Sequence, residues 1–287
     1  MEVLGKVADL RDFLAKMRAQ GKRIGFVPTM GFLHVGHLAL MRDARSDGAD
    51  CVLASIFVNP LQFGPREDYR DYPRDLDRDK ELCRQAGVDA LFVPPVEEMY
   101  PQGFATYVEV AGITEVLCGR SRPGHFKGVA TVVAKLFNIV RPDYAYFGLK
   151  DAQQVAVIQR MAQDLNFPVE VRVHPTVREK DGLAVSSRNV YLSPEERKAA
   201  PVIYRTLERA GEAVERGERD AGRLIKLLEE GIRAERSARL DYAEVVSWPD
   251  LSIITKKIGP GRVLLALAAY FGKARLIDNI LVDVEVE

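Results

Sequence analysis

The sequence predicts an α/β protein, a parallel sheet with flanking helices followed by a smaller α+β part. Short apolar runs alternate with helix-length amphipathic stretches up to about Val177, which is the pattern of strands joined by crossover helices. From about Arg178 onwards charged helices come first and strands follow. The 287 residues exceed the roughly 150 of a typical domain, so one large domain or two unequal ones are both plausible.

The first part of the chain contains six apolar runs of strand length and four stretches in which apolar residues recur every three or four positions. The first 20 residues also show helical spacing, with acids and bases among the apolar residues, unlike the apolar core of a signal peptide. The predicted strands are 23–28, 51–58, 90–93, 107–110, 144–147 and 169–173, and the predicted helices are 38–45, 75–86, 129–139 and 153–164.

The second part predicts helices at 194–216 and 221–236, then strands at 241–246, 262–270 and 274–281. We therefore expect a domain of residues 1–177 and a second, α+β domain of residues 178–287. No segment approaches the roughly 20 apolar residues that a membrane-spanning helix needs. No membrane association is expected.

The composition is that of an ordinary soluble globular protein, with 47% hydrophobic and 29% charged residues. Lys plus Arg and Asp plus Glu each total 41, so global charge gives no reason to expect nucleic acid as a partner, although a local basic cleft for phosphate remains possible. Cys51, Cys83 and Cys118 are scattered and lack CxxC spacing, which indicates neither a disulfide framework nor a zinc site. A soluble protein of the reducing cytoplasm is expected.

Ligands of open parallel sheets bind beyond the carboxyl ends of the strands, and a histidine-containing turn follows the first predicted strand. It reads Pro28-Thr-Met-Gly-Phe-Leu-His-Val-Gly-His37 and leads into a helix. Free backbone N–H groups at a helix start favour phosphate, and His34 and His37 add two imidazoles that can donate hydrogen bonds. The turn therefore indicates a triphosphate site. Two surface histidines in an ordinary loop are the alternative.

Two further clusters contain polar side chains suited to a small anionic substrate. Asn59 and Gln62 follow the second strand and can bond hydroxyls or carboxylates beside apolar neighbours, although an ordinary turn with a solvated Gln62 explains them as well. The segment Arg120–Gly128 carries three cations and His125 ahead of an apolar helix, which favours anions. A surface loop is its alternative.

The last two clusters lie near Lys150 and Arg188. Lys150 can reach a phosphate, Asp151 can cap the next helix and Gln154 would point back to the strand end, with a plain helix cap as the alternative. Ser186, Ser187 and Arg188 suit phosphate oxygens in a polar loop. Four of the five clusters lie at or near carboxyl ends of predicted parallel strands, which favours one shared ligand site over unrelated surface loops.

The blocks PTMGFLHVGH, SIFVNPLQF, RPGHFKGVATVVAKLFNIVRPDYAYFG, KDAQQ and SSRNVYLS, in this order, resemble the pantothenate synthetase family over essentially the whole chain. The resemblance implies a Rossmann-like domain of the nucleotidyltransferase type that binds ATP and pantoate, a smaller C-terminal lid domain, and a cytoplasmic homodimer. It implies a ligase of the coenzyme A pathway that condenses pantoate with β-alanine, using ATP and Mg²⁺, to give pantothenate, AMP and pyrophosphate through a pantoyl adenylate.

The resemblance also implies roles for individual residues. His34, His37, Lys150 and Arg188 would be catalytic, with His37 as the proton donor. Leu149 and Val185 stand where the family commonly has Glu and Met. Pantoate or β-alanine would contact Gln62, Gln154 and Asn59, and ATP would contact Met30, Gly31, Phe32, Leu33, His34, Val35, Gly36, His37, Gly148, Leu149, Lys150, Asp151, Val177, Val185, Ser186, Ser187 and Arg188.

The motifs leave other chemistries open. A nucleotidyltransferase that keeps the nucleotidyl group on its product shares the His-x-Gly-His turn, whereas a dinucleotide-dependent oxidoreductase lacks support because no G-x-G-x-x-G follows the first strand. A non-catalytic nucleotide sensor is the third alternative. No Mg²⁺ ligand is assigned, because a solvated helix face explains the acids Asp75, Asp77 and Asp79 equally well.

Overall fold

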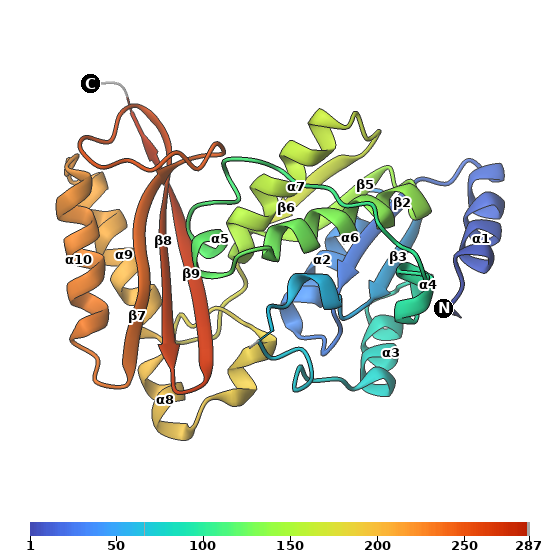
Figure 1. The fold of residues 1–287 in the computed structure, drawn as a ribbon, viewed down its shortest axis with the longest axis horizontal. Helices are drawn as coiled ribbons and strands as arrows, with labels where there is room; N and C mark the ends of the chain where they lie inside the picture. Colours follow the sequence, from blue (N-terminus) through green and yellow to red (C-terminus); the bar gives the residue numbers. More distant parts are fainter. Residues whose placement is uncertain (66, 286–287) are drawn as a thin grey trace. The chain divides into compact units, whose positions relative to one another are not determined.

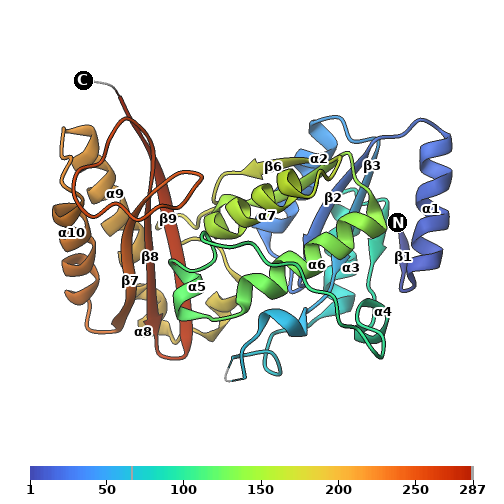
Figure 2. The same cartoon turned by 45° about the horizontal axis from the view of Figure 1, so that its top comes forward.

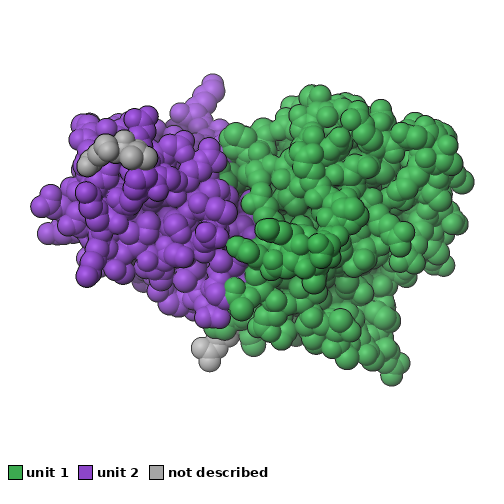
Figure 3. All heavy atoms as spheres, turned by 90° about the horizontal axis from the view of Figure 1, so that it is seen from above, with its two compact units in different colours: residues 1–111, 122–149, 157–175 green, residues 112–121, 150–156, 176–287 purple. Residues whose placement is uncertain are grey.

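The computed structural model describes residues 1–65 and 67–285. Internal contacts divide the chain into two compact units, coloured green and purple in Figure 3. Unit 1 comprises residues 1–111, 122–149 and 157–175, and unit 2 comprises residues 112–121, 150–156 and 176–287. Residues 112–121 and 150–156 of the predicted first domain therefore belong to unit 2, as do residues 176 and 177. Residues 286 and 287 of the predicted second domain lie outside the described residues.

Unit 1 is built on a six-stranded parallel sheet with the strand order β1-β4-β3-β2-β5-β6. Figure 1 labels β2, β3, β5 and β6 of this sheet. Strands β2 and β3 lie next to each other in its middle (Figure 2), and Thr29 pairs with Ile56 at their carboxyl ends. Parallel strands need crossover connections, which the intervening helices supply. The strands are β1 (Glu2–Leu4), β2 (Ile24–Thr29), β3 (Cys51–Ile56), β4 (Ala90–Phe92), β5 (Tyr144–Gly148) and β6 (Glu170–His174).

The helices between these strands bury their apolar faces on the sheet. Leu38, Met41 and Ala44 of α2 share one core with Cys83 of α3 and the strands beneath them. The helices are α1 (Val7–Ala19), α2 (Val35–Ser46), α3 (Leu76–Gln85), α4 (Val96–Met99), α6 (His125–Val140) and α7 (Ala152–Asp164), with the short 3₁₀ turns η1 (Pro60–Gln62) and η2 (Leu149–Asp151). The predicted α/β architecture is confirmed.

Unit 2 contains an antiparallel sheet in the order β7-β8-β9, and α9 and α10 pack on it. Leu207 and Leu224 lie in its core with Leu265 of the central strand, all fully buried. Its elements are α5 (Cys118–Ser121), η3 (Ser187–Tyr191), α8 (Pro194–Ala199), α9 (Val202–Glu215), α10 (Ala221–Arg233), β7 (Ala238–Ser247), β8 (Gly261–Phe271) and β9 (Ala274–Val284). The smaller α+β part is confirmed.

Three element predictions were wrong in ways that local physics explains. Residues 107–110 form no strand, because Val108 exchanges its backbone hydrogen bonds with the Thr131 hydroxyl of α6. The single helix expected at 194–216 is interrupted at Pro201, which has no N–H to continue the helical bonds. The edge strand β1 was missed, since three residues give no readable alternation.

The helix predicted at 38–45 begins three residues earlier, at Val35. His34 is therefore its N-cap and His37 lies in its first turn. Within the described residues, no helix has the length and apolar character required to span a membrane.

Candidate active site

The turn that joins β2 to α2 has a backbone that only particular residues tolerate. Gly31 and Phe32 both adopt positive φ, of 83° and 49°. A side chain at Gly31 would place its Cβ 2.9 Å from Ile56 Cγ2 and 3.0 Å from Asp79 Oδ2, so the turn needs glycine there. Thr29 Oγ1 accepts the Gly31 N–H at 3.1 Å and donates to the Ser55 carbonyl at 2.7 Å, which ties the turn to β3.

Asp79 of α3 holds the same turn from the other side. Its Oδ2 accepts the Phe32 N–H and its Oδ1 accepts the Leu33 N–H, each at 2.7 Å. The residue is only 1% exposed, and this burial raises the pKa of its carboxyl group despite the two backbone donors. The sequence singled Asp79 out only as one of three nearby acids, and the structure assigns it to the shape of the turn.

Replacing Asp79 by alanine should destabilise the protein through this turn. One buried and one partly buried N–H group would lose their acceptors, so we expect the free energy of unfolding to fall by about 2 kcal/mol or more. Urea unfolding measures this loss. Asp77→Ala on the same helix is the matched control, since the Asp77 side chain is 96% exposed and should lose almost nothing. Equal stability of the two variants would contradict the structural role of Asp79.

The two histidines lie at the start of α2, where backbone N–H groups point out of the helix. Their ring centroids are 4.0 Å apart, and His37 Nδ1 accepts the His34 N–H at 3.3 Å. A neutral imidazole whose Nδ1 accepts must carry its proton on Nε2. His37 therefore presents an Nε2–H donor, which can bond a phosphate oxygen at this positively polarised helix end.

Gln62 follows β3 in the turn η1 and is joined to the histidine-bearing turn by a contact. Its Nε2 lies 3.0 Å from Met30 Sδ. Asn59 is 1% exposed, and its Nδ2 donates to Gln62 Oε1 and to the Gly128 carbonyl, both at 3.1 Å. A Cβ at Gly128 would lie 2.3 Å from the Leu61 carbonyl oxygen, so helix α6 can approach this turn only with glycine there.

The Arg122 guanidinium contacts the same turn, where its Nη2 donates to the Gln62 carbonyl at 3.4 Å. It donates to Glu67 through Nε at 2.8 Å and Nη2 at 2.6 Å, and its Nη1 lies 3.0 Å from His125 Nε2. His125 Nδ1 lies 2.8 Å from the Gln62 carbonyl oxygen. The predicted basic cluster is thus divided: Arg122 and His125 support Gln62, whereas Arg120 pairs with Glu244 within unit 2.

The Glu67–Arg122 ion pair should make the stability of the fold depend on pH in the acid range. Burial raises the pKa of Glu67, but the Arg122 hydrogen bonds and charge outweigh it, so the pKa is lowered overall. A lowered carboxyl pKa stabilises the fold above the ordinary value of about 4.3 and loses this contribution as the pH falls through the folded-state pKa. As the pH falls through the folded-state pKa, we expect the melting temperature of the wild type to decrease more steeply than that of Glu67→Gln.

Melting curves between pH 7 and pH 3 measure this difference. Wild type should exceed Glu67→Gln at pH 7 and converge with it at the acid end. Glu109→Gln is the control, because Glu109 pairs with Lys127 at an exposed site and should follow wild type throughout. A gap between wild type and Glu67→Gln that does not narrow with acid would contradict the assignment.

In unit 2, the backbone of Lys150 is held by β9. Asn279 Nδ2 donates to the Lys150 carbonyl at 2.9 Å. The preceding residue of β9, Asp278, is 4% exposed and accepts two hydrogen bonds from Arg178, at 2.5 and 3.0 Å. Burial raises the pKa of Asp278, and the guanidinium opposes that rise.

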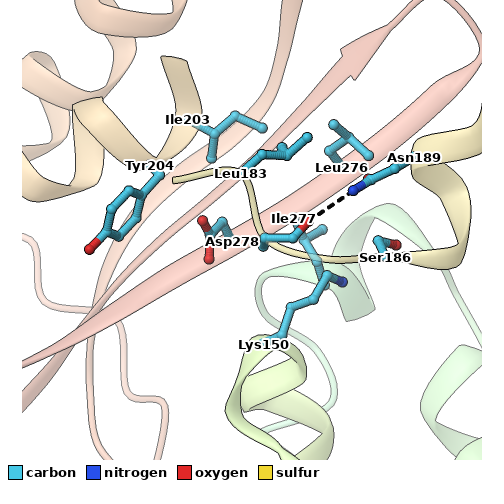
Figure 4. Close-up of a pocket in the computed structure, with 10 residues that line it drawn as sticks. Lys150, Leu183, Ser186, Asn189, Ile203, Tyr204, Leu276, Ile277 and Asp278 are labelled. Atoms are coloured by element: carbon cyan, nitrogen blue, oxygen red, sulfur yellow. Dashed lines mark hydrogen bonds between the residues drawn. The ribbon is translucent and has the colours of Figure 1, made fainter. Parts of the chain in front are cut away.

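Lys150 and Ser186 line a cavity of about 10 Å³ that also contacts Asn189 and Asp278 (Figure 4). This volume corresponds to about one water molecule. Asn189 Nδ2 donates to the Ala184 carbonyl at 3.1 Å, the dashed line in Figure 4, which shapes the loop that carries Ser186. The structure thus brings together two of the clusters that the sequence analysis singled out.

The other predicted nucleotide contacts lie on the segment around Ser186 and close to Lys150 in the sequence. Val185 donates its N–H to the Val177 carbonyl at 3.0 Å, so these two positions are neighbours. Ser186 Oγ accepts the Arg188 N–H at 3.3 Å at the start of η3. Gly148 ends β5 two residues before Lys150, so covalent geometry holds their Cα atoms within about 7.6 Å. Asp151 follows in η2 and Gln154 in the first turns of α7.

The acids considered for Mg²⁺ already have other partners. Asp75 caps α3 by accepting the Arg78 N–H at 3.1 Å, Asp77 pairs with Lys80 at 3.1 Å, and Asp79 binds the turn. Across residues 1–65 and 67–285 no group of three or more His, Cys, Asp or Glu side chains is placed to hold a metal ion.

The parallel sheet and the His-x-Gly-His turn at the start of α2 are the features of a class of nucleotide-binding α/β enzymes. The family model of pantoate–β-alanine ligase matches residues 2–281. The chain therefore belongs to the pantoate–β-alanine ligase family.

Curated relatives agree with this assignment. The pantothenate synthetase of Pelotomaculum thermopropionicum is 58% identical, with 98% of this chain and 99% of the relative covered. That of Carboxydothermus hydrogenoformans is 57% identical, with 99% and 100% covered.

Solved structures share the fold as well as the sequence. The pantothenate synthetase of Thermus thermophilus superposes with a TM-score of 0.91 at 53% identity, covering 98% of this chain and 99% of that one. The pantoate–β-alanine ligase of Francisella tularensis, solved with β,γ-ATP and β-alanine, gives 0.79 at 35% identity, covering 98% and 97%. The Rossmann-like domain with a smaller C-terminal domain is thereby confirmed.

Proposed function

We propose that the turn from Met30 to His37 binds the ATP phosphates and that Gln62 holds pantoate beside them. The chain is an ATP-dependent ligase that condenses pantoate with β-alanine to pantothenate, releasing AMP and pyrophosphate. The observation that carries the residue roles is the 3.0 Å contact between Gln62 Nε2 and Met30 Sδ. It makes the proposed nucleotide turn and the proposed substrate amide neighbours, as transfer between two bound substrates requires.

The first step is the attack of the pantoate carboxylate on the α-phosphorus of ATP, which forms the pantoyl adenylate as the bond to pyrophosphate breaks. Negative charge grows on the leaving pyrophosphate, so donors and cations aimed at it lower the barrier. We assign the His37 Nε2–H to this task, together with His34, Lys150 and Arg188. The remaining predicted nucleotide contacts, from Gly148 to Asp151 and at Val177 and Val185 to Ser187, position the nucleotide.

In the second step the neutral amine of β-alanine attacks the acyl carbon, the C–O bond to AMP breaks, and the amine loses a proton. Gln62 and Gln154 hold the pantoyl group, and Asn59 belongs to the same substrate region. The anhydride is reactive and has to be kept from water until the amine attacks it.

Mg²⁺ fits this site as a companion of ATP rather than as a resident ion. Such ions are usually held by substrate phosphates with one or two carboxylates. When bound, it neutralises phosphate charge.

Isotope exchange tests the adenylate. The enzyme should exchange labelled pyrophosphate into ATP when pantoate is present and β-alanine is absent. With β-alanine added, mass analysis should find pantothenate and AMP in equal amounts. A nucleotidylated product would instead favour the nucleotidyltransferase chemistry, and active enzyme without pantoate-dependent exchange would refute the adenylate.

We also propose a homodimer in the cytoplasm, as the family resemblance implies. Light scattering of the purified protein should give twice the chain mass of 32.0 kDa. Cys51, Cys83 and Cys118 are buried free thiols, which is compatible with a reducing compartment.

A further inference from the structure

A row of hydrogen bonds, partly buried at Tyr100 and buried at Asn59, leads from Tyr100 to the amide of Gln62. Tyr100 directly follows α4, and its hydroxyl donates to Asn59 Oδ1 at 2.8 Å. Asn59 in turn donates to Gln62 Oε1 at 3.1 Å. Tyr100 matched none of the sequence motifs, because its partner is 41 residues away along the chain.

Two backbone groups decide which way the Asn59 amide points. The Leu61 N–H can only donate, and it bonds Oδ1 at 3.3 Å. The Gly128 carbonyl can only accept, and it receives Nδ2 at 3.1 Å. Turning the amide over would set oxygen against carbonyl oxygen and N–H against N–H. Asn59 Oδ1 therefore faces Tyr100, and the tyrosine must be the donor.

The orientation of Asn59 then decides the orientation of Gln62. Asn59 Nδ2 donates its second hydrogen to the Gln62 amide, so the oxygen of that amide must face Asn59. Gln62 Nε2 consequently points to the other side, where it lies 3.0 Å from Met30 Sδ. A thioether is a weak acceptor, so an incoming carboxylate or hydroxyl oxygen can replace it.

We propose that Tyr100 is a positioning residue of the ligase: acting through Asn59, it sets the Gln62 amide so that Gln62 offers an N–H donor to an oxygen of pantoate. The proposal rests on the proposed function of Gln62. Tyr100 and Asn59 do not touch the substrate in this scheme, because the four hydrogen-bonding positions of the Asn59 amide are used by the protein.

The surroundings of Tyr100 keep its hydroxyl in place and protonated. Its ring packs between Phe57 and Phe104, with centroid distances of 5.9 and 4.9 Å. Burial raises the pKa of Tyr100 far above its usual range. The hydroxyl therefore remains a donor throughout the working pH range.

Tyr100→Phe removes the donor and keeps the ring. Asn59 would retain its two hydrogen bonds to backbone groups, but its Oδ1 would lose the Tyr100 donor. The orientations of the Asn59 and Gln62 amides would then be less tightly fixed. We expect the pantoate KM to rise roughly three- to tenfold, the scale of one neutral hydrogen bond, with the ATP KM unchanged within about twofold. Tyr107→Phe is the matched control, because Tyr107 also stacks on Phe104 but is 48% exposed. It should behave as wild type.

A double-mutant cycle separates positioning from simple loosening of the fold. In a Gln62→Ala background, where no amide remains to be oriented, Tyr100→Phe should leave pantoate affinity unchanged. Affinity is measured calorimetrically with an ATP analogue that cannot transfer AMP, so the cycle needs no turnover. An unchanged pantoate KM in Tyr100→Phe, an equal rise in the ATP KM, or additive effects in the cycle would each overturn the proposal.

Asn59→Asp is a second test of the proposed orientation of Gln62 if Tyr100→Phe does not fold. The introduced carboxylate cannot donate to Gln62 Oε1, so the Gln62 amide should turn its oxygen towards pantoate and raise the pantoate KM by more than roughly tenfold. A wild-type pantoate KM in this variant would refute the proposal. Absence of pantothenate from the wild-type enzyme would instead refute the proposed function, so the two failures are distinguishable.

Discussion

His37→Asn should reduce turnover by roughly 100-fold or more, the usual cost of losing one donor aimed at transition-state charge. The oxygen of asparagine can still accept the His34 N–H, which His37 Nδ1 accepts at 3.3 Å in the wild type. The start of α2 should therefore survive the change. What is lost is the donor at Nε2, which we assign to the phosphates. Steady-state pyrophosphate release measures the effect.

His37→Gln is the informative control, because its amide nitrogen can reach the region that Nε2 occupies and can donate there. We expect it to recover part of the lost rate. Unfolding temperatures of both variants should stay near that of wild type. Near-normal turnover in His37→Asn would remove the assigned role, and equal rates in the two variants would show that the donor is not the feature that matters.

Lys150→Met should lower kcat by about 100-fold or more, since it removes a cation proposed to neutralise the leaving pyrophosphate while keeping most of the side-chain volume. The backbone around Lys150 should not change, because Asn279 donates to its carbonyl whatever the side chain. Lys150→Arg should recover only part of the rate, because a planar guanidinium cannot reproduce a compact ammonium group. Initial rates at saturating ATP and pantoate measure both.

Lys180→Met is the matched control in the same unit, because Lys180 is exposed. It removes the same charge and should leave kcat unchanged. A Lys150→Met enzyme with wild-type kcat would contradict the proposal, and a similar loss in Lys180→Met would point to net charge rather than to a specific contact.

The sequence was informative wherever a pattern is local. The alternation of strands and helices in unit 1 followed from periodicity, and so did the order of helices and strands in unit 2. Periodicity failed at 107–110, where Thr131 of another element takes the backbone hydrogen bonds that a neighbouring strand would have taken. It also failed at β1, whose pairing with β4 joins distant parts of the chain, as Glu2 opposite Ala90 shows.

The candidate site divides in the same way. Motif spacing singled out His34 and His37, and their neighbours in sequence supplied the strand end and helix start on which they lie. Gln62 gained its expected substrate role only from the family resemblance. Asp79, Tyr100 and Asn279 carried no such signal. Each bonds a site residue or its immediate partner across 41 residues or more of chain.

By itself, the sequence determined the parallel α/β fold and pointed to a phosphate site at the strand ends, because helical and strand periods and short motifs are properties of neighbouring residues. The reaction came from the resemblance of whole sequence blocks to the pantoate–β-alanine ligase family, which the family model over residues 2–281 confirms. Only the tertiary structure decided how the loops of the site are held. Asp79 shapes the phosphate-type turn, Asn59 orients Gln62, and Asn279 anchors Lys150. Buried polar groups need hydrogen-bond partners, and the fold supplies these from distant parts of the chain. Such pairs cannot be read from the order of the residues in the sequence.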